Sequence, residues 1–177
     1  MPHAHIRPAT DRDLPDLVHH LQAADFFRDR LDLQRRGHGV LLIAFRDAVP
    51  VGHVYLWLAP AHEYEIRAEL PGVPLLNRLA VAKQHRNQGI GTALLTCAEK
   101  RLRVSGHDRV ALGVGLENGD AIRLYRRRGY RQWRLPPIVA RTGGDLGNGG
   151  GTGEIEIFTI FVKDLGAGGG SSASHRL

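Results

Sequence analysis

The sequence is short of cysteine, of long apolar runs and of anything resembling a leader. Its single cysteine, Cys97, excludes an internal disulfide and fits a reducing compartment. The longest mostly apolar stretch, Val51 to Ala61, is interrupted by His53 and is too short to span a membrane. Residues 1–7 lack a basic region followed by an apolar core, so we identify no signal peptide. These absences predict a soluble, cytoplasmic protein with no membrane partner.

Size and charge narrow the class further. The 177 residues correspond to one domain, and a hydrophobic content of 42% supplies one sizeable core. The net charge of +6 and a pI near 10.1 favour an anionic partner, such as nucleic acid, a membrane surface or a phosphate-bearing cofactor. Half of the residues from Arg123 to Arg134 are arginine, a run that by itself is typical of a solvated helix face. No basic module with interleaved aromatic residues is visible, so we expect no nucleic-acid partner.

The glycines are concentrated near the carboxyl terminus. Half of the 22 glycines lie between Gly143 and Gly170. We expect a flexible loop at 143–153 and a disordered tail at 166–177, with a strand at 154–162 between them. The loop would then join the last two strands inside a single domain of residues 1–165. The apolar face of the 154–162 strand suggests a homodimer interface.

The remaining elements follow from hydrophobic periodicity and turn signals. Strands are expected at residues 5–7, 40–46, 51–58, 75–81, 110–114 and 130–135. Helices are expected at 11–21, after Thr10 as N-cap, and at 24–36, 89–105 and 120–128. Residues 60–71 read as a polar loop. This order predicts an α/β fold whose sheet is mixed and mostly antiparallel, with a parallel crossover around the helix that begins at Gly89.

The segment from Leu79 to Leu95 is the most informative one. A strand ends at Val81, a polar connector follows, and Arg86 to Thr92 (RNQGIGT) leads into an apolar helix. Glycines at a helix start let a ligand approach the backbone N–H groups that have no intrahelical partner. With the helix dipole they form an anion site that suits a pyrophosphate. The pattern is neither a P-loop nor the three-glycine dinucleotide fingerprint.

Two motifs carry a resemblance to a known family. Arg86 to Leu95 (RNQGIGTALL) resembles the acyl-coenzyme A binding motif of the GNAT superfamily of N-acetyltransferases, and Glu117 to Tyr130 (ENGDAIRLYRRRGY) resembles its Asn-x-x-Ala-x-x-Leu-Tyr-x-x-x-Gly-Phe/Tyr segment. The opening Ile6 to Thr10 (IRPAT) is also similar to that of many members. The resemblance covers residues 6–134 and leaves the glycine-rich segments uncovered.

The resemblance implies a sheet flanked by helices, with a splayed strand pair that receives the acyl-coenzyme A arm. It implies acetyl-coenzyme A as the donor. The Val81 N–H would polarise the thioester carbonyl, and the N–H groups from Gln88 to Thr92 would hold the pyrophosphate. The implied cofactor-binding residues are Leu79, Ala80, Val81, Arg86, Asn87, Gln88, Gly89, Ile90, Gly91, Thr92, Asn118 and Ala121.

Tyr125 is the catalytic residue that the resemblance implies. It would protonate the departing coenzyme A thiolate, and a phenol suits this role because its ordinary pKa of about 10 lies near that of a thiol. Read without the family, Tyr125 is more typical of a buried helix tyrosine. One or more arginines of the run Arg126 to Arg128 could reach the 3′-phosphate of the cofactor.

The acceptor amine and its base are less well defined. Many relatives carry a carboxylate on the strand 75–81, but here Asn77 stands in that position, and an amide cannot take a proton. Glu63, Glu65 and Glu69 in the 60–71 segment could attract a cationic amine, or could form a solvated loop. His53 and His85 are further candidate bases. The ten histidines form no pattern of metal ligands, so we expect no metal.

Three hypotheses from different classes follow. The first is an acetyl-coenzyme A dependent N-acetyltransferase acting on a small cationic amine, with an aminoglycoside antibiotic as first candidate, similar to the kasugamycin-type resistance enzymes. The second is a protein acetyltransferase that modifies a lysine or an N-terminus. The third is a coenzyme A sensor without enzymatic activity on the same fold.

Overall fold

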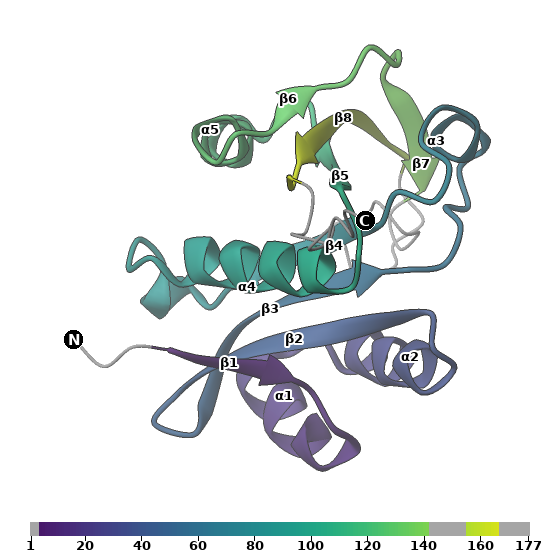
Figure 1. Cartoon of the computed structure of the whole chain (residues 1–177). Helices are drawn as coiled ribbons and strands as arrows, with labels where there is room; N and C mark the ends of the chain where they lie inside the picture. Colours follow the sequence, from purple (N-terminus) through teal and green to yellow (C-terminus); the bar gives the residue numbers. More distant parts are fainter. Residues whose placement is uncertain (1–3, 142–154, 167–177) are drawn as a thin grey trace, which may run out of the picture.

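The computed structural model describes residues 4–141 and 155–166 of the chain (Figure 1). The expected loop at 143–153 and the expected tail, apart from Gly166, lie outside these residues. Across the described ranges, no helix combines the length and the apolar character that a membrane span needs.

The first half of the chain alternates strands with short helices. Its elements are β1 (His5–Pro8), η1 (Asp11–Asp13), α1 (Leu14–Leu21), α2 (Ala24–Arg35), β2 (Gly39–Arg46), β3 (Val49–Trp57), α3 (Tyr64–Glu69) and β4 (Leu75–Val81). The second half contains η2 (Lys83–His85), α4 (Ile90–Val104), β5 (Arg109–Gly115), α5 (Gly119–Arg127), β6 (Arg131–Gln132), β7 (Ile138–Arg141) and β8 (Ile155–Asp164).

Two parts of the predicted element order are wrong. The polar loop expected at 60–71 contains the helix α3, because Ile66 and Leu70 lie one turn apart and both are buried against the core. Its entry is held by the Arg67 guanidinium, which donates to the carbonyl oxygens of Ala61 and His62. The strand expected at 130–135 is shortened to β6, and β7 follows it as a further strand that the sequence reading missed.

The strands form one sheet with the order β1-β2-β3-β4-β5-β8-β6, and β7 also pairs with β8. Every pairing is antiparallel except that of β4 with β5. The predicted mixed, mostly antiparallel sheet is therefore confirmed. Because β8 is paired with β5 on one side and with β6 and β7 on the other, its edges are already occupied.

Helices cover both faces of the sheet (Figure 1). Leu17, Phe27 and Leu31 of α1 and α2 pack against alternate β2 residues such as Leu41 and Ile43. On the other face, α4 packs through Ile90, Leu94, Leu95, Ala98 and Leu102 against the intervening set that includes Leu42 and Ala44. The period-2 alternation of β2 thus supplies both cores, and this is why its interior is apolar throughout.

The parallel pair β4 and β5 separates soon after it forms. Its register comprises Leu75 with Ala111 and Leu76 with Leu112, yet β4 runs on to Val81 and β5 to Gly115. Past Leu76, β4 keeps β3 as its partner and β5 keeps β8. The expected splayed strand pair is present, and the β4 edge that faces β5 is open beyond Leu76.

A buried ion pair ties α4 to the last strand. The Glu99 carboxylate accepts a hydrogen bond from the Tyr130 hydroxyl at 3.0 Å and pairs with the Lys163 ammonium at 2.7 Å. Burial and the adjacent carboxylate together raise the pKa of Tyr130 far above its usual range, so its hydroxyl stays protonated as the donor. Glu99 therefore satisfies two polar groups at the junction of α4, α5 and β8.

We expect Glu99→Ala to lower the free energy of unfolding by about 3–5 kcal/mol, because it leaves the Lys163 ammonium and the Tyr130 hydroxyl without a partner. Urea unfolding measures the change. Glu117→Ala is the matched control, since Glu117 is exposed and should shift stability by no more than about 0.5 kcal/mol. A loss at Glu99 as small as that at Glu117 would contradict this account.

Candidate functional site

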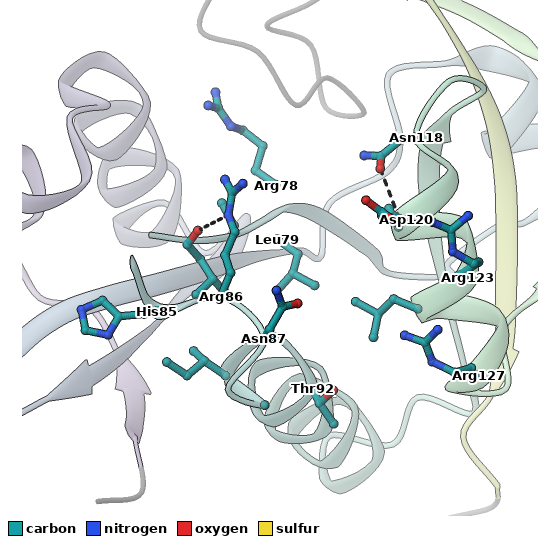
Figure 2. A pocket seen from close by; sticks show the side chains of 17 residues that line it. Arg78, Leu79, His85, Arg86, Asn87, Thr92, Asn118, Asp120, Arg123 and Arg127 are labelled. Atoms are coloured by element: carbon teal, nitrogen blue, oxygen red, sulfur yellow. Dashed lines mark hydrogen bonds and ion pairs between the residues drawn. The ribbon is translucent and has the colours of Figure 1, made fainter. Parts of the chain in front are cut away.

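A cleft of about 1060 Å³ opens where β4 parts from β5 (Figure 2). Its walls are the end of β4, the amino-terminal turn of α4 and one side of α5. The lining residues are Arg78, Leu79, Ala80, Val81, His85, Arg86, Asn87, Gly89, Ile90, Gly91, Thr92, Asn118, Asp120, Ala121, Arg123, Leu124 and Arg127.

The floor of the cleft is the start of α4. Gly89 is the N-cap and has a φ of 79°, in the left-handed region that a side chain rarely adopts, and Asn87 just before it has a φ of 58°. A side chain at Gly91 would begin 3.8 Å from the Val81 Cγ2. The turn thus leaves the first N–H groups of α4 uncovered by side chains, and their dipoles favour an anion.

Arginines give the cleft a positive charge. Arg86, Arg123 and Arg127 line it together with one carboxylate, Asp120, which is already paired with Arg123. The Arg86 Nε donates to the Val81 carbonyl oxygen at 3.0 Å and so bridges the connector back to β4. Figure 2 shows Arg123 and Arg127 on the α5 side, opposite the start of α4. This arrangement suits a ligand with several phosphate groups.

The cofactor-binding residues expected from the sequence lie together in this cleft, with one exception. Gln88 is absent from the lining, because its amide accepts from Arg46 at 2.5 Å and donates to the Gln84 carbonyl. The sequence reading missed four lining residues, Arg78, Asp120, Arg123 and Leu124; it had offered Arg127 within the run Arg126 to Arg128 for the 3′-phosphate, and His85 only as a candidate base. The spacing of Arg123 and Arg127, one helical turn apart, was a usable signal for a common face.

Asn118 and the arginine run have separate positions. The Asn118 Oδ1 caps α5 by accepting from the Ala121 N–H at 3.1 Å, at the edge of the cleft. Arg127 lines the cleft, whereas Arg126 lies over the Phe161 ring and Arg128 donates to the Thr96 hydroxyl. Of the run, Arg127 is therefore placed to meet a ligand there.

Tyr125 lies on α5, one turn after Ala121, and is not part of the cleft lining. Its ring packs edge-on against Tyr130, with the ring centres 5.6 Å apart. Burial raises the pKa of Tyr125 to about 12, so the phenol is protonated at neutral pH. Tyr125 is therefore a protonated phenol on α5, the helix that forms one wall of the cleft.

The expected acceptor residues are not brought together. Glu65 and Glu69 are exposed on α3, and Glu63 is half-buried at its N-cap. None of the three lines the cleft. Asn77 is 2% exposed on the β4 strand, and within residues 4–141 and 155–166 its Oδ1 and Nδ2 have no hydrogen-bond partner.

The two candidate histidines differ in environment. His53 is buried on β3, and burial together with the nearby Arg78 charge lowers its pKa to about 3. An imidazole with so low a pKa is neutral and too weak a base to hold the proton of an amine. His85 lines the cleft, with its Nδ1 3.4 Å from an Arg46 guanidinium nitrogen. Among the side chains that the structure describes, no three metal-binding groups come together.

Comparison with known proteins agrees with this geometry. The model of the acetyltransferase (GNAT) family matches residues 5–130. An aminoalkylphosphonate N-acetyltransferase of Salmonella typhimurium is 29% identical over 138 residues, which cover 75% of this chain and 88% of that protein. An N-alpha-acetyltransferase of Sulfurisphaera tokodaii is 38% identical over 58 residues, 32% of this chain and only 35% of that relative.

Solved structures agree on the fold. The structure of a ribosomal-protein-alanine N-acetyltransferase from Brucella melitensis superposes with a TM-score of 0.66 at 21% identity, over 90% of this chain and 99% of that one. At this identity the likeness supports a shared fold and says nothing about a shared acceptor.

We expect Gly89→Val to weaken binding of coenzyme A by about 10- to 100-fold, because the branched side chain strains the left-handed cap and turns the N–H groups of α4 away from the anion. Isothermal titration measures the affinity. Gly106→Val is the matched control: Gly106 follows the other end of the same helix, with a φ of 89° and equally open space. Equal affinities of the two variants for coenzyme A would show that the start of α4 is not the anion site.

Proposed function

This chain belongs to the acetyltransferase (GNAT) family and is an acetyl-coenzyme A dependent N-acetyltransferase, and we propose that its acceptor is the amine of a small molecule. The observation that supports coenzyme A as the donor is the joining of two features in one cleft. A glycine-capped helix start lies beside the β4 edge that faces β5, which pairs with no other strand beyond Leu76 in the described part of the chain. The first suits a pyrophosphate, and the second suits an extended amide-bearing arm that pairs as a strand does.

We assign the contacts of the acyl donor, acetyl-coenzyme A, as follows. The first turn of α4, from Gly89 to Thr92, holds the pyrophosphate of coenzyme A. Arg127 contacts its 3′-phosphate from the opposite side of the cleft. The backbone of Leu79 to Val81 pairs with the pantetheine arm. The Val81 N–H then polarises the thioester carbonyl, which gains negative charge in the transition state.

The transfer itself requires one nucleophile and one acid. The neutral amine attacks the thioester carbon, the carbon–sulfur bond breaks, and we propose that the Tyr125 hydroxyl gives its proton to the leaving sulfur. The attacking nitrogen gives one proton to water as the amide forms, and the Tyr125 phenolate takes a proton back from water. The raised pKa of Tyr125 keeps that proton in place until the thiolate forms. A thiolate that leaves into the same buried setting also has a raised pKa, which narrows the mismatch between donor and acceptor.

The acceptor side lacks the expected base. Asn77 can accept a hydrogen bond from the amine but cannot remove its proton, and His53 is too weak a base at a pKa of about 3. We therefore propose that the amine loses its proton to solvent before attack. The rate should accordingly rise with pH toward the pKa of the amine.

The relatives support a small acceptor over a protein. The match to the aminoalkylphosphonate N-acetyltransferase extends over 75% of this chain, whereas the match to the N-alpha-acetyltransferase extends over 32%. The aminoglycoside hypothesis was based on Glu63, Glu65 and Glu69. Because these side chains lie on or beside α3, outside the cleft lining, aminoglycosides are kept only as compounds to be tested. A peptide amine is the second candidate.

The substrate class can be tested by thiol release from acetyl-coenzyme A with a panel of amines. The panel contains aminoglycosides, polyamines, amino acids, aminoalkylphosphonates, and peptides with a free N-terminus or lysine. We expect turnover with at least one small amine and none with the peptides. Turnover confined to peptides would replace the proposal with protein acetylation, and a silent panel with bound coenzyme A would favour the sensor.

The proposed role of Tyr125 as general acid is tested by the variant Tyr125→Phe. We expect kcat to fall by about 10²- to 10⁴-fold while the affinity for acetyl-coenzyme A stays within about twofold, as for loss of a general acid. Steady-state kinetics and a binding titration separate the two effects. Tyr64→Phe is the control, because Tyr64 is 72% exposed on α3. An unchanged kcat in Tyr125→Phe would take the role away from this residue.

A further inference from the structure

A set of buried polar side chains adjoins Tyr125 at the junction of α4, α5 and β8. It consists of Tyr130 after α5, Glu99 on α4 and Lys163 on β8, and we call it the Tyr130 anchor. Tyr130 and Glu99 are 2% and 4% exposed, and the Lys163 side chain is largely covered. None of the three lines the cleft, and the transfer proposed above does not use them.

The carboxyl-terminal turn of α5 ties Tyr125 to Tyr130 through the backbone. Gly129 follows the helix with a φ of 86°, in the left-handed region, and its N–H donates to the Arg126 carbonyl oxygen at 3.1 Å. The Tyr130 N–H donates to the Tyr125 carbonyl oxygen at 3.0 Å. These two bonds form a Schellman motif, in which the residue after the glycine packs against the residue three positions before the C-cap. Here that pair is Tyr130 and Tyr125.

The rings of Tyr125 and Tyr130 make the side-chain contact of this motif. Their centres are 5.6 Å apart and their planes are inclined by 66°. This is the edge-to-face geometry that aromatic pairs favour, because the positive edge of one ring meets the negative face of the other. The Tyr130 ring therefore restricts the directions in which the Tyr125 hydroxyl can point.

Contacts with two distant elements fix the Tyr130 ring itself. Its hydroxyl donates to the Glu99 Oε1 at 3.0 Å, and the Oε2 of the same carboxylate accepts from the Lys163 ammonium at 2.7 Å. The Lys163 Nζ also lies 5.5 Å from the centre of the Tyr130 ring. Both hydrogen bonds are charge-assisted, since the acceptor is ionised. A residue of α4 and a residue of β8 thus hold the ring on which Tyr125 packs.

The hydroxyl of Tyr130 is not needed to fill the core. A phenylalanine ring would occupy the same space, and without the hydroxyl there would be less reason to bury a carboxylate and an ammonium, whose desolvation is costly. A fully hydrogen-bonded buried network instead makes its members rigid. A general acid gains from a rigid support, since a misplacement of about 1 Å can cost about 10²-fold in rate.

From this geometry we propose that Tyr130 is a positioning residue for the transfer, and that Glu99 and Lys163 act through it to aim the Tyr125 hydroxyl at the leaving sulfur. The inference rests on the proposed role of Tyr125 as general acid, and it extends that role to three residues that do not touch the donor. Tyr125 lies on the helix that walls the cleft but is not among the lining residues. Its reach toward the sulfur therefore depends on the angle at which its ring is held.

The variant Tyr130→Phe tests the inference, because it keeps the ring and removes only the hydroxyl that Glu99 holds. We expect kcat to fall by about 5- to 20-fold, as for a displacement of the acid by less than 1 Å, while the affinity for coenzyme A stays within about twofold. Steady-state kinetics with the best amine of the panel and a titration with coenzyme A measure the two quantities.

A double-mutant cycle separates positioning from a general loss of structure. If the Tyr130 hydroxyl acts through Tyr125, Tyr130→Phe has no further effect on kcat in the Tyr125→Phe background. Glu99→Gln should also lower kcat, because a neutral amide holds the hydroxyl less firmly, and its effect should likewise disappear in that background. Equal fold losses with and without the Tyr125 hydroxyl would show that the anchor only supports the fold, and the inference would be wrong.

Asp13→Asn is the matched control for lost stability. Asp13 accepts two hydrogen bonds from the Arg7 guanidinium, at 2.7 and 2.8 Å, and Arg7 belongs to β1, three strands away from β4. This variant also weakens a partly buried ion pair, yet it should leave kcat unchanged. A fall in kcat equal to that of Tyr130→Phe would attribute both losses to stability and contradict the positioning role.

Structures with bound coenzyme A cover the case in which no amine of the panel is turned over. We expect the Tyr125 hydroxyl within hydrogen-bonding distance of the coenzyme A sulfur in the unaltered protein and displaced from it in Tyr130→Phe. A hydroxyl that points away from the sulfur in the unaltered protein would refute the acid, and the inference with it. A hydroxyl that stays beside the sulfur in both proteins would refute the inference alone.

Discussion

The cleft depends on the parallel strands β4 and β5, which separate directly after a short paired segment. β4 and β5 share the register of Leu75 and Leu76 with Ala111 and Leu112, and then each follows its other neighbour. A sheet that closed this gap would satisfy every backbone group and have no cleft. Because the gap stays open, the β4 edge beyond Leu76 pairs with no other strand among the described residues, and it lies beside the start of α4 in one cleft.

The bulge at Arg78 extends the effect of that opening to the far face of the sheet. Without an extra residue in β4, the side chains from Asn77 to Val81 would alternate strictly between the faces. With it, Arg78 lines the cleft while its guanidinium lies over the Phe26 ring of α2. The cost is a non-glycine residue at a φ of 49°. Strain of this kind persists where the surroundings impose it, and it is common beside functional sites.

How much of the fold and of the site can be predicted from the sequence depends on how far apart along the chain the interacting residues lie. The α4 start was predictable because its signal is local: two glycines, a preceding arginine and an apolar face within a few turns. Arg123 and Arg127 were equally accessible, one turn apart on a helix. The α3 helix and the short β6 were not, because six-residue and two-residue elements are decided by packing of residues such as Ile66 against distant strands.

The stacking of Arg30 and Arg78 on the Phe26 ring was beyond sequence reasoning for a different cause. Arg30 and Arg78 are 48 positions apart, and only the sheet order places α2 over β4 with the Phe26 ring between them. The same arrangement gives the basic composition a specific meaning. Arg123 and Arg127 line the cleft opposite the start of α4, whereas Arg30 and Arg78 stack on the Phe26 ring, so these arginines are divided between two places.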